Sequence, residues 1–339
     1  MNSETLTRTA QEIMADGKGI LAADESTGTI TKRLSSIDVE STEGNRQAYR
    51  NLLFTTEGVA QHISGVILYE ETLYQAADDG TPFPKLLADQ GIVPGIKVDK
   101  GAKPLALSGD EKITEGLDGL RERLADYAKA GARFAKWRAV IDIADDQPTD
   151  YCIDVNANAL ARYAALCQEA DIVPIVEPEV LMDGGHDIAV CEAVTGRVLK
   201  AVFDALNTQQ VMLEGMLLKP NMIIAGKKSA RQADVDAVAE ATLRCLKRYV
   251  PASVPGIVFL SGGQSDELAT AHLDAMNKRG PHPWKLSFSY GRALQAPALA
   301  AWRGEPENVP AAQAAYLKRA RNNGAAAAGR YESTMENVA

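Results

Sequence analysis

The sequence is poor in the residues that build metal sites and disulfide frameworks. Its 339 residues include only four cysteines and four histidines. No two cysteines form a Cys-x-x-Cys pair, which argues against a structural zinc site or a set of disulfides and fits a reducing cytosol. No two histidines have the helical spacing of metal ligands, so we expect no histidine-built metal site and predict neither a metal nor a cofactor.

Excess positive charge and long apolar runs are also lacking. The chain has 36 Lys and Arg against 45 Asp and Glu, a net charge of -9, so nothing favours nucleic acid or an anionic membrane as a partner. No stretch approaches the roughly 18 apolar residues of a membrane span, and the N-terminus has no signal-peptide pattern. We therefore expect a cytoplasmic protein in which an anionic substrate needs a local basic pocket.

Short apolar segments alternate with longer amphipathic ones. The apolar segments predict eight buried strands, at residues 19–23, 65–69, 93–98, 133–137, 172–177, 213–219, 256–260 and 285–290. Helical patterns lie between them, at residues 45–61, 117–130, 156–169, 188–206, 234–249 and 266–278. This alternation is typical of a single (β/α)8 TIM barrel with its active site at the C-terminal ends of the strands.

An open, doubly wound α/β sheet is the alternative fold, but no Gly-x-Gly-x-x-Gly follows any strand. The stretch Gly226-Lys227-Lys228-Ser229 is similar to part of a phosphate-binding loop, yet the leading glycine is absent, so we assign it no such function. No linker rich in Gly, Pro or Ser divides the chain. We expect one barrel domain over residues 1–321 and a short flexible tail over residues 322–339.

Charged and polar residues follow nearly every predicted strand. In chain order they are Asp24, Lys97, Asp99, Lys136, Arg138, Glu177, Glu179, Lys219, Ser261 and Arg292. In a barrel these strand ends meet on one face. Any one pair could be a structural ion pair, but a whole ring of charges at the strand ends is better explained as an active site.

Strand geometry groups these charges further. Side chains two residues apart point to the same face of a strand, so Lys136 and Arg138 are expected to point together while Trp137 faces the helices. The same spacing gives two further pairs, Glu177 with Glu179 and Lys97 with Asp99.

Lys219 ends an apolar run that Pro220 stops. Lysine is almost never buried unless it is paired or functional. A free lysine has a pKa of about 10.4, but burial beside Leu218 and repulsion by a cation such as Lys136 both disfavour its charge. A neutral lysine is a nucleophile for ketones and aldehydes, whereas the plain alternative is a lysine that reaches the surface.

Other residues have the chemistry to assist such a nucleophile. Asp24 and Glu177 are carboxylates that can transfer protons. The cations of the ring and the turn Ser261-Gly262-Gly263 suit phosphate, although such a turn taken alone could be purely structural.

Seven blocks, in order, resemble those of class I fructose-bisphosphate aldolases. They are LAADESTG (21–28), GIKVDKG (95–101), FAKWR (134–138), VEPE (176–179), LLKPNM (217–222), FLSGGQ (259–264) and SFSYGRALQ (287–295), and GVILYEETLYQ (65–75) is similar too. The resemblance extends to about Tyr331. It implies a TIM-barrel homotetramer that reversibly cleaves fructose 1,6-bisphosphate to dihydroxyacetone phosphate and glyceraldehyde 3-phosphate through a lysine Schiff base, without a metal, in glycolysis and gluconeogenesis.

The resemblance also implies roles for single residues. Lys219 would form the iminium with the ketone carbon, while Glu177 would move protons during carbinolamine formation and dehydration. Asp24 would take the proton from the hydroxyl on carbon 4, and Lys136 would keep Lys219 neutral and stabilise developing negative charge. The remaining residues would bind the substrate or influence the catalytic groups. Arg292, Ser261 and Gly262 would hold the phosphate on carbon 1, and Lys97 and Arg138 would contact the substrate or the other phosphate. Glu179 would tune Glu177 and the lysines, and the hydroxyl of Thr29, where the family often has serine, would contact phosphate.

The C-terminus departs from the family pattern. Animal members end in a tyrosine on a mobile tail that assists the enamine proton step, whereas this chain ends Glu336-Asn337-Val338-Ala339 and has its last tyrosine at Tyr331. Another group is therefore expected to make that proton transfer, or the step is slower.

Three other functions stay open on these residues. A different Schiff-base sugar-phosphate aldolase would need only one phosphate site. A non-catalytic binding protein on an aldolase barrel is disfavoured by the intact ring, and a zinc-dependent aldolase by the few histidines. Preference among fructose bisphosphate, fructose 1-phosphate and sedoheptulose bisphosphate is not determined by the residues.

Overall fold

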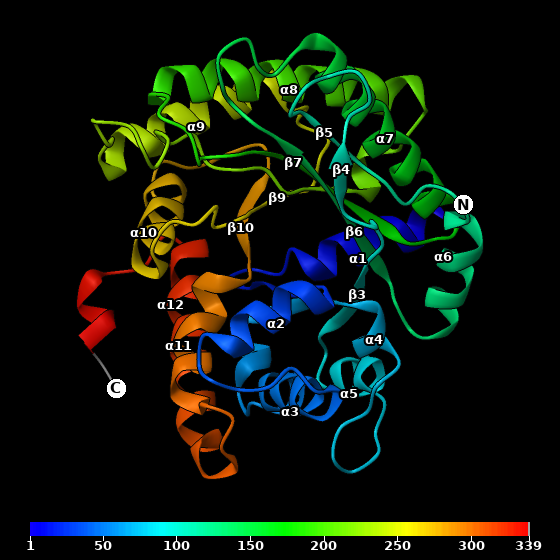
Figure 1. Ribbon diagram of the computed structural model, residues 1–339, viewed down its shortest axis with the longest axis vertical. Helices are drawn as coiled ribbons and strands as arrows, with labels where there is room; N and C mark the ends of the chain where they lie inside the picture. Colours follow the sequence, from blue (N-terminus) through cyan, green and yellow to red (C-terminus); the bar gives the residue numbers. More distant parts are fainter. Residues whose placement is uncertain (338–339) are drawn as a thin grey trace.

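Eight parallel strands close into a barrel with helices around it (Figure 1). The computed structural model describes residues 1–337. The barrel strands are β1 (Gly19–Ala23), β2 (Ile63–Leu68), β3 (Val93–Lys97), β6 (Phe134–Ile141), β7 (Val173–Val180), β8 (Leu217–Leu218), β9 (Gly256–Phe259) and β10 (Lys285–Tyr290). β1 and β10 complete the closure, with Ile20 aligned to Ser289. The predicted (β/α)8 barrel is confirmed, and the open sheet is excluded.

Helices follow most of the strands and form the outer layer. They are α1 (Ser3–Ile13), α2 (Thr27–Ser35), α3 (Glu43–Phe54), α4 (Glu70–Leu73), α5 (Phe83–Asp89), α6 (Leu120–Lys129), α7 (Asp150–Glu169), α8 (Ile188–Thr208), α9 (Val235–Tyr249), α10 (Asp266–Asn277), α11 (Arg292–Trp302) and α12 (Val309–Ala327). Short 3₁₀ turns are η1 (Val59–Gln61), η2 (Leu213–Gly215), η3 (Pro306–Asn308) and η4 (Ser333–Asn337), and β4 (Ala102–Pro104) pairs with β5 (Lys112–Thr114) in a hairpin. Within residues 1–337, none of the helices offers the continuous apolar length that a membrane crossing requires.

The two faces of each strand enter two different cores. On β1, Ile20 and Ala22 belong to a core inside the barrel, while Leu21 and Ala23 pack with the surrounding helices. The inner core is completed by Ile67, Val93, Phe134, Val173, Ile175, Leu217 and Val258. This alternation is the period-two pattern of a strand, and it decides which later residues point into the barrel.

Phe134 fills the middle of the barrel because its neighbours are glycines. A Cβ atom at Gly95 would lie 2.3 Å from the Phe134 ring, and one at Gly65 would lie 3.3 Å away. Glycine at these strand positions therefore makes room for one large ring where several smaller side chains would otherwise meet.

Helix α1 closes the N-terminal end of the barrel. Leu6, Ala10 and Ile13 lie on one face of the helix and join the inner core. The spacing of four and then three residues is that of a helical apolar stripe. Asn2 caps the helix by accepting the Thr5 N–H at 3.1 Å, which satisfies one of its free amides.

The prediction of a sixth strand over residues 213–219 is too long. Only Leu217 and Leu218 pair in β8, and Leu213–Gly215 forms η2. The Gln168 side-chain amide donates to the carbonyls of Met212 and Gly215 at 2.7 and 3.2 Å. Backbone groups that a strand would use are thus bonded by a side chain from α7.

Helix α12 runs across residue 321, where the sequence predicts the boundary between barrel and tail. Residues 322–327 continue α12, and Asn322 and Asn323 are fully buried. Beyond the helix, Glu336 pairs with Arg319, which fixes η4 against α12. The low-complexity, alanine-rich stretch is good helix-forming sequence, which accounts for the helix over residues 322–327. Val338 and Ala339, the end of the expected tail, lie outside the described residues.

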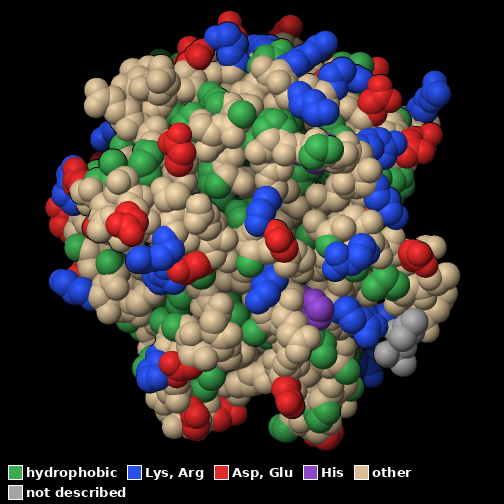
Figure 2. All heavy atoms as spheres, turned by 180° about the vertical axis from the view of Figure 1, so that it is seen from behind, with side chains coloured by type: hydrophobic (Ala, Val, Ile, Leu, Met, Phe, Trp, Pro, Cys, Tyr) green, Lys and Arg blue, Asp and Glu red, His purple; other side chains and the backbone are tan. Residues whose placement is uncertain are grey.

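Charges of both signs are mixed over the outer surface seen in Figure 2. Lys and Arg side chains there alternate with Asp and Glu, in keeping with a net charge of only -9. Lys97, Lys136, Arg138 and Lys219 are instead grouped at the C-terminal end of the barrel.

Candidate active site

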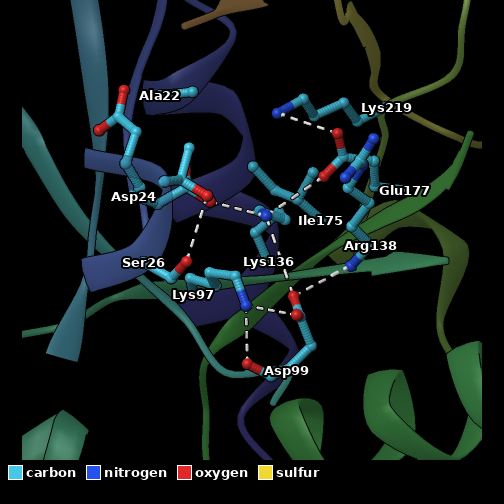
Figure 3. Close-up of polar contacts among 12 residues, drawn as sticks. Ala22, Asp24, Ser26, Lys97, Asp99, Lys136, Arg138, Ile175, Glu177 and Lys219 are labelled. Atoms are coloured by element: carbon cyan, nitrogen blue, oxygen red, sulfur yellow. Dashed lines mark hydrogen bonds and ion pairs between the residues drawn. The ribbon is translucent and has the colours of Figure 1, made fainter. Parts of the chain in front are cut away.

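A layer of charged side chains lies directly above the apolar layers of the barrel. Each of its members follows, by two residues, an inward-facing residue of the inner core. The four are Asp24 after Ala22, Lys136 after Phe134, Glu177 after Ile175 and Lys219 after Leu217. Strand alternation alone therefore brings two lysines and two carboxylates together in the barrel mouth (Figure 3).

Lys136 is the centre of this layer (Figure 3). Its Nζ lies 2.6 Å from Asp24 Oδ2, 3.5 Å from Glu177 Oε2 and 3.9 Å from Asp99 Oδ2. Burial alone would lower the pKa of Lys136, but the three carboxylates outweigh burial and raise that pKa above its ordinary value. Lys136 is therefore a fixed ammonium charge at neutral pH.

Lys219 lies across Glu177 from Lys136. Its side chain is 5% exposed, and its Nζ is 3.3 Å from Glu177 Oε1. The backbone is held by the Lys219 N–H, which donates to the Val176 carbonyl at 2.8 Å. A single carboxylate thus bridges two lysine amines, an arrangement that can pass protons to and from a group bound at Lys219.

Asp24 is ionised in this setting. Burial would raise the pKa of Asp24, but the charges of Lys136, Lys219 and Lys97 outweigh it and hold the pKa well below the usual carboxyl range. The next residue, Glu25, holds the backbone at Asp24 in place through two ion pairs. Its Oε2 lies 2.6 Å from an Nη of Arg50, and its other oxygen pairs with Arg33. An ionised carboxylate in the barrel mouth can accept a proton from a substrate hydroxyl.

One side of the mouth opens into a cavity of about 300 Å³. Its lining includes Ser26, Thr29, Lys97, Asp99 and Arg138. Arg138 forms an ion pair with Glu179, and Lys97 forms one with Asp99. Burial, reinforced by the charge of Lys136, lowers the pKa of Lys97, while Asp99 opposes that shift. This cavity brings together three cations, Lys97, Lys100 and Arg138, and the first turn of α2, which suits a phosphate group.

A second group of cations surrounds the turn Ser261-Gly262-Gly263. Gly262 and Gly263 both have positive φ, at +57° and +75°. A Cβ atom at Gly263 would lie 2.8 Å from the Nζ of Lys227 and 3.1 Å from an Nη of Arg292, so both cations stand over the turn. Arg292 is the first residue of α11 and approaches Gly263, the residue that follows the predicted phosphate ligands Ser261 and Gly262.

Two cations at the site were missed from the sequence. Arg33 approaches Gly291, whose added Cβ would lie 3.6 Å from an Arg33 Nη. The sequence pattern could have indicated Arg33. It lies four residues after the predicted ligand Thr29, and residues at this spacing lie on the same face of a helix. Lys227 belongs to the stretch Gly226-Lys227-Lys228-Ser229, whose similarity to a phosphate loop was set aside because its motif was incomplete.

Tyr331 is placed away from the charged layer. Its hydroxyl donates to Glu336 Oε1 at 3.1 Å, and its backbone N–H donates to Asp274 at 2.9 Å. Burial, helped by the charge of Glu336, raises the pKa of Tyr331 to about 12. Tyr331 therefore serves as an anchor for the C-terminal segment.

The described part of the chain has no candidate metal site built from protein side chains. Among residues 1–337, no group of three or more His, Cys, Asp or Glu side chains has the geometry to hold a metal ion. The four cysteines, at positions 152, 167, 191 and 245, are all free and buried.

A (β/α)8 barrel with buried lysines and carboxylates at the C-terminal ends of its strands is the scaffold of an enzyme, and the comparisons with known proteins specify which. Residues 5–339 match the family described as fructose-bisphosphate aldolase class-I. The chain is 57% identical to a probable fructose-bisphosphate aldolase class 1 of Xylella fastidiosa over 98% of its length and all of that protein. It is 59% identical to fructose-bisphosphate aldolase 1 of Toxoplasma gondii, covering 97% of this chain and 91% of the relative.

A solved structure agrees with the sequence comparisons. Fructose-bisphosphate aldolase from Plasmodium falciparum, determined in complex with TRAP and a small-molecule inhibitor, superposes with a TM-score of 0.96 at 52% identity, over 97% of this chain and 96% of the other. The chain belongs to the class I fructose-bisphosphate aldolase family.

Proposed function

We propose that the protein reversibly cleaves fructose 1,6-bisphosphate to dihydroxyacetone phosphate and glyceraldehyde 3-phosphate through a Schiff base on Lys219. The observation that carries this proposal is the buried layer in which Glu177 bridges Lys219 and Lys136 while Asp24 pairs with Lys136. Membership of the class I aldolase family supports the reaction and the substrate.

The first half of the reaction uses Lys219 and Glu177. The Lys219 amine attacks the ketone carbon, carbon 2, and forms a carbinolamine. Glu177, 3.3 Å from the amine, first takes a proton from the Lys219 ammonium and then gives it to the carbinolamine hydroxyl, which leaves as water as the iminium forms. The fixed charge of Lys136, 3.5 Å from Glu177, would stabilise negative charge that develops during these steps.

The second half of the reaction uses Asp24. Its carboxylate takes the proton from the hydroxyl on carbon 4, and that hydroxyl becomes the aldehyde of glyceraldehyde 3-phosphate. The bond between carbons 3 and 4 breaks, and its electrons move toward the iminium to give an enamine. Protonation at carbon 3 and hydrolysis then release dihydroxyacetone phosphate and the free Lys219 amine.

The two phosphates have separate cationic sites. The turn at Ser261 and Gly262, with Arg292, would bind the phosphate on carbon 1, and the approach of Arg292 to Gly263 supports this role. The cavity with Thr29, Lys97 and Arg138 suits the other phosphate. Two such sites favour a bisphosphate over the monophosphate sugars of other Schiff-base aldolases.

Borohydride trapping tests the proposal directly. Reduction in the presence of dihydroxyacetone phosphate should fix the substrate carbons on the peptide that carries Lys219, and the Lys219→Met variant should give no adduct. Turnover should also persist after treatment with a strong chelator. An adduct on another lysine, or no adduct on a folded protein, would overturn the mechanism.

We further propose a cytoplasmic location and a role in glycolysis and gluconeogenesis. Two of the relatives in Arabidopsis thaliana are named as cytosolic aldolases, which supports the location. The homotetramer implied by the resemblance is part of the same proposal, and sedimentation of the purified chain at micromolar concentration tests it.

A further inference from the structure

Lys227 lies at the turn Ser261-Gly262-Gly263 and has no role in the proposed mechanism. It belongs to the loop that follows β8. It comes directly after the buried segment of residues 219–226, which starts at the nucleophile candidate Lys219. Its own N–H donates to the Met182 carbonyl at 2.7 Å, and the neighbouring Gly226 and Lys228 N–H groups donate to His186 and Gly184 at 2.9 and 3.0 Å. Three consecutive hydrogen bonds to the loop after β7 therefore fix the backbone at Lys227.

The two loops meet so closely that no side chain fits between them. A Cβ atom at Gly226 would lie 2.2 Å from the Gly184 carbonyl oxygen. Real Cβ contacts are never so short, so glycine at position 226 is required for this approach. The direction in which the Lys227 side chain leaves the loop is accordingly set by backbone packing.

That direction takes the Lys227 amine over Gly263, where it meets Arg292. The distances of 2.8 and 3.1 Å from a hypothetical Gly263 Cβ bring an ammonium and a guanidinium close to the same point beside the turn. Like charges repel at such separations unless an anion lies between them. The arrangement therefore points to an anionic occupant.

Lys227 has such an anion beside it, the carboxylate of Asp183. Its Oδ1 lies 2.9 Å from Lys227 Nζ, and the side chains are 60% and 46% exposed. The hydrogen bond from Lys227 lowers the pKa of Asp183, and the charges of Lys227 and Arg292 contribute to the same shift. Ion pairs as exposed as this one contribute little stability, so a better anion can replace the carboxylate.

We propose that Lys227 is a second side-chain ligand of the phosphate that binds at the Ser261-Gly262-Gly263 turn, and that Asp183 occupies Lys227 until that phosphate arrives. The inference rests on the proposed function, because it deepens the assignment of this turn to a substrate phosphate. A phosphate monoester has a charge of about -1.5 to -2 at pH 7 and three acceptor oxygens, against a single charge on the carboxylate. It can bond Lys227, Arg292 and the turn amides at once, which Asp183 cannot do.

The test compares Lys227→Met with Lys228→Met, a change of the same kind at the next, exposed residue. KM and kcat for fructose 1,6-bisphosphate are measured together with the Ki of inorganic phosphate as a competitive inhibitor. Loss of a charge-assisted contact at a half-exposed position should raise KM and Ki about 5-fold while kcat stays within about 2-fold. Lys228→Met should leave both constants within about 2-fold, and Lys227→Arg should recover most of the phosphate affinity. Equal effects of the two methionine variants would overturn the proposal.

Asp183→Asn tests the second half of the proposal. Removing a carboxylate that competes with phosphate should lower the Ki of phosphate about 2- to 3-fold, and the same change should have no effect in the Lys227→Met background. If Asp183 only positioned the lysine, Asp183→Asn would instead raise Ki, and its role as a displaceable anion would be refuted.

The outcome can be separated from that of the proposed function. Failure of the borohydride trap at Lys219 would refute the aldolase mechanism itself. A successful trap in wild type and in Lys227→Met, with Arg292→Ala raising the Ki of phosphate and Lys227→Met leaving it unchanged, would refute only the role of Lys227.

Discussion

Two aspartate–lysine pairs lie at opposite ends of the barrel and have the same length. Asp16 Oδ1 is 2.6 Å from Lys285 Nζ at the N-terminal end, and Asp24 Oδ2 is 2.6 Å from Lys136 Nζ at the C-terminal end. The side chains of the first pair are 91% and 54% exposed, whereas those of the second are 14% and 4% exposed. Equal distances therefore describe very different interactions.

The difference shows how the barrel divides its tasks. At the N-terminal end, α1 fills the interior with apolar side chains and leaves its ion pair in water, where such a pair contributes about 0–1 kcal/mol. At the other end, charges occupy the interior, and each is tolerated only because several opposite charges surround it. One end stabilises the fold, and the other maintains reactive groups in defined protonation states.

The largest expected effect separates the lysines of the two ends. Lys219→Met should reduce kcat by about 10⁵-fold or more, because no other group can form the covalent intermediate. Lys285→Met, at the start of β10, should change kcat by less than about 2-fold. Steady-state kinetics, with circular dichroism to confirm folding, measure both. Substantial activity of the Lys219 variant would show that the charged layer does not act through this amine.

The next effect concerns stability rather than turnover. Ile13→Ala on α1 should lower the free energy of unfolding by about 2–5 kcal/mol, because it leaves a cavity in the inner core. The activity per folded molecule should stay within about 2-fold. Urea denaturation gives the stability, and the exposed Gln11→Ala on the same helix is the control, with an expected change within about 0.5 kcal/mol. A large loss of kcat in folded Ile13→Ala would show that the two ends are not independent.

The smallest effect compares the two pairs themselves. Asp24→Asn should cost about 1–3 kcal/mol at pH 7, since it removes the nearest counter-charge of buried Lys136. The pKa of Asp24 is depressed in the folded protein, so its stabilising effect is complete above its ordinary pKa of about 3.9 and is lost as pH falls through the lower folded-state value.

The difference between wild type and Asp24→Asn should therefore be constant above about pH 5 and shrink below about pH 4. Urea midpoints measured from pH 3 to pH 7 give this curve. Asp16→Asn should differ from wild type by less than about 0.5 kcal/mol throughout, as befits an exposed pair. Parallel curves for Asp24→Asn and wild type down to pH 3 would contradict the assigned protonation state.

The sequence was sufficient to predict features that depend on strand periodicity. Eight apolar segments predicted the barrel, and the two-residue period predicted that Lys136 would lie on the strand face opposite Trp137 and that Glu177 would share a face with Glu179. These predictions were possible because the relation between a residue and its neighbour two positions away is local. The resemblance to a family added substrate and roles that periodicity does not contain.

Features that depend on distant residues could not be predicted in this way. β8 is short because Gln168 bonds the backbone before it. Lys227 reaches the turn Ser261-Gly262-Gly263 because Gly226 packs on Gly184, and no local sequence pattern encodes that contact. The burial of Asn322 and Asn323 was not predictable either, because the alanine-rich stretch has weak apolar periodicity and its burial depends on what packs against α12.

Closure of the barrel between β1 and β10 also constrains how the chain can be made. Ile20 leaves the ribosome early, but its partner in the neighbouring strand is Ser289, which is made near the end of synthesis. Until then β1 has one unpaired edge, and the apolar face of α1 has an incomplete barrel to enter. Such edges and faces are prone to mispairing, so the nascent chain passes most of its synthesis in an aggregation-prone form. The barrel is thus completed only when β1, its first strand, pairs with β10, its last.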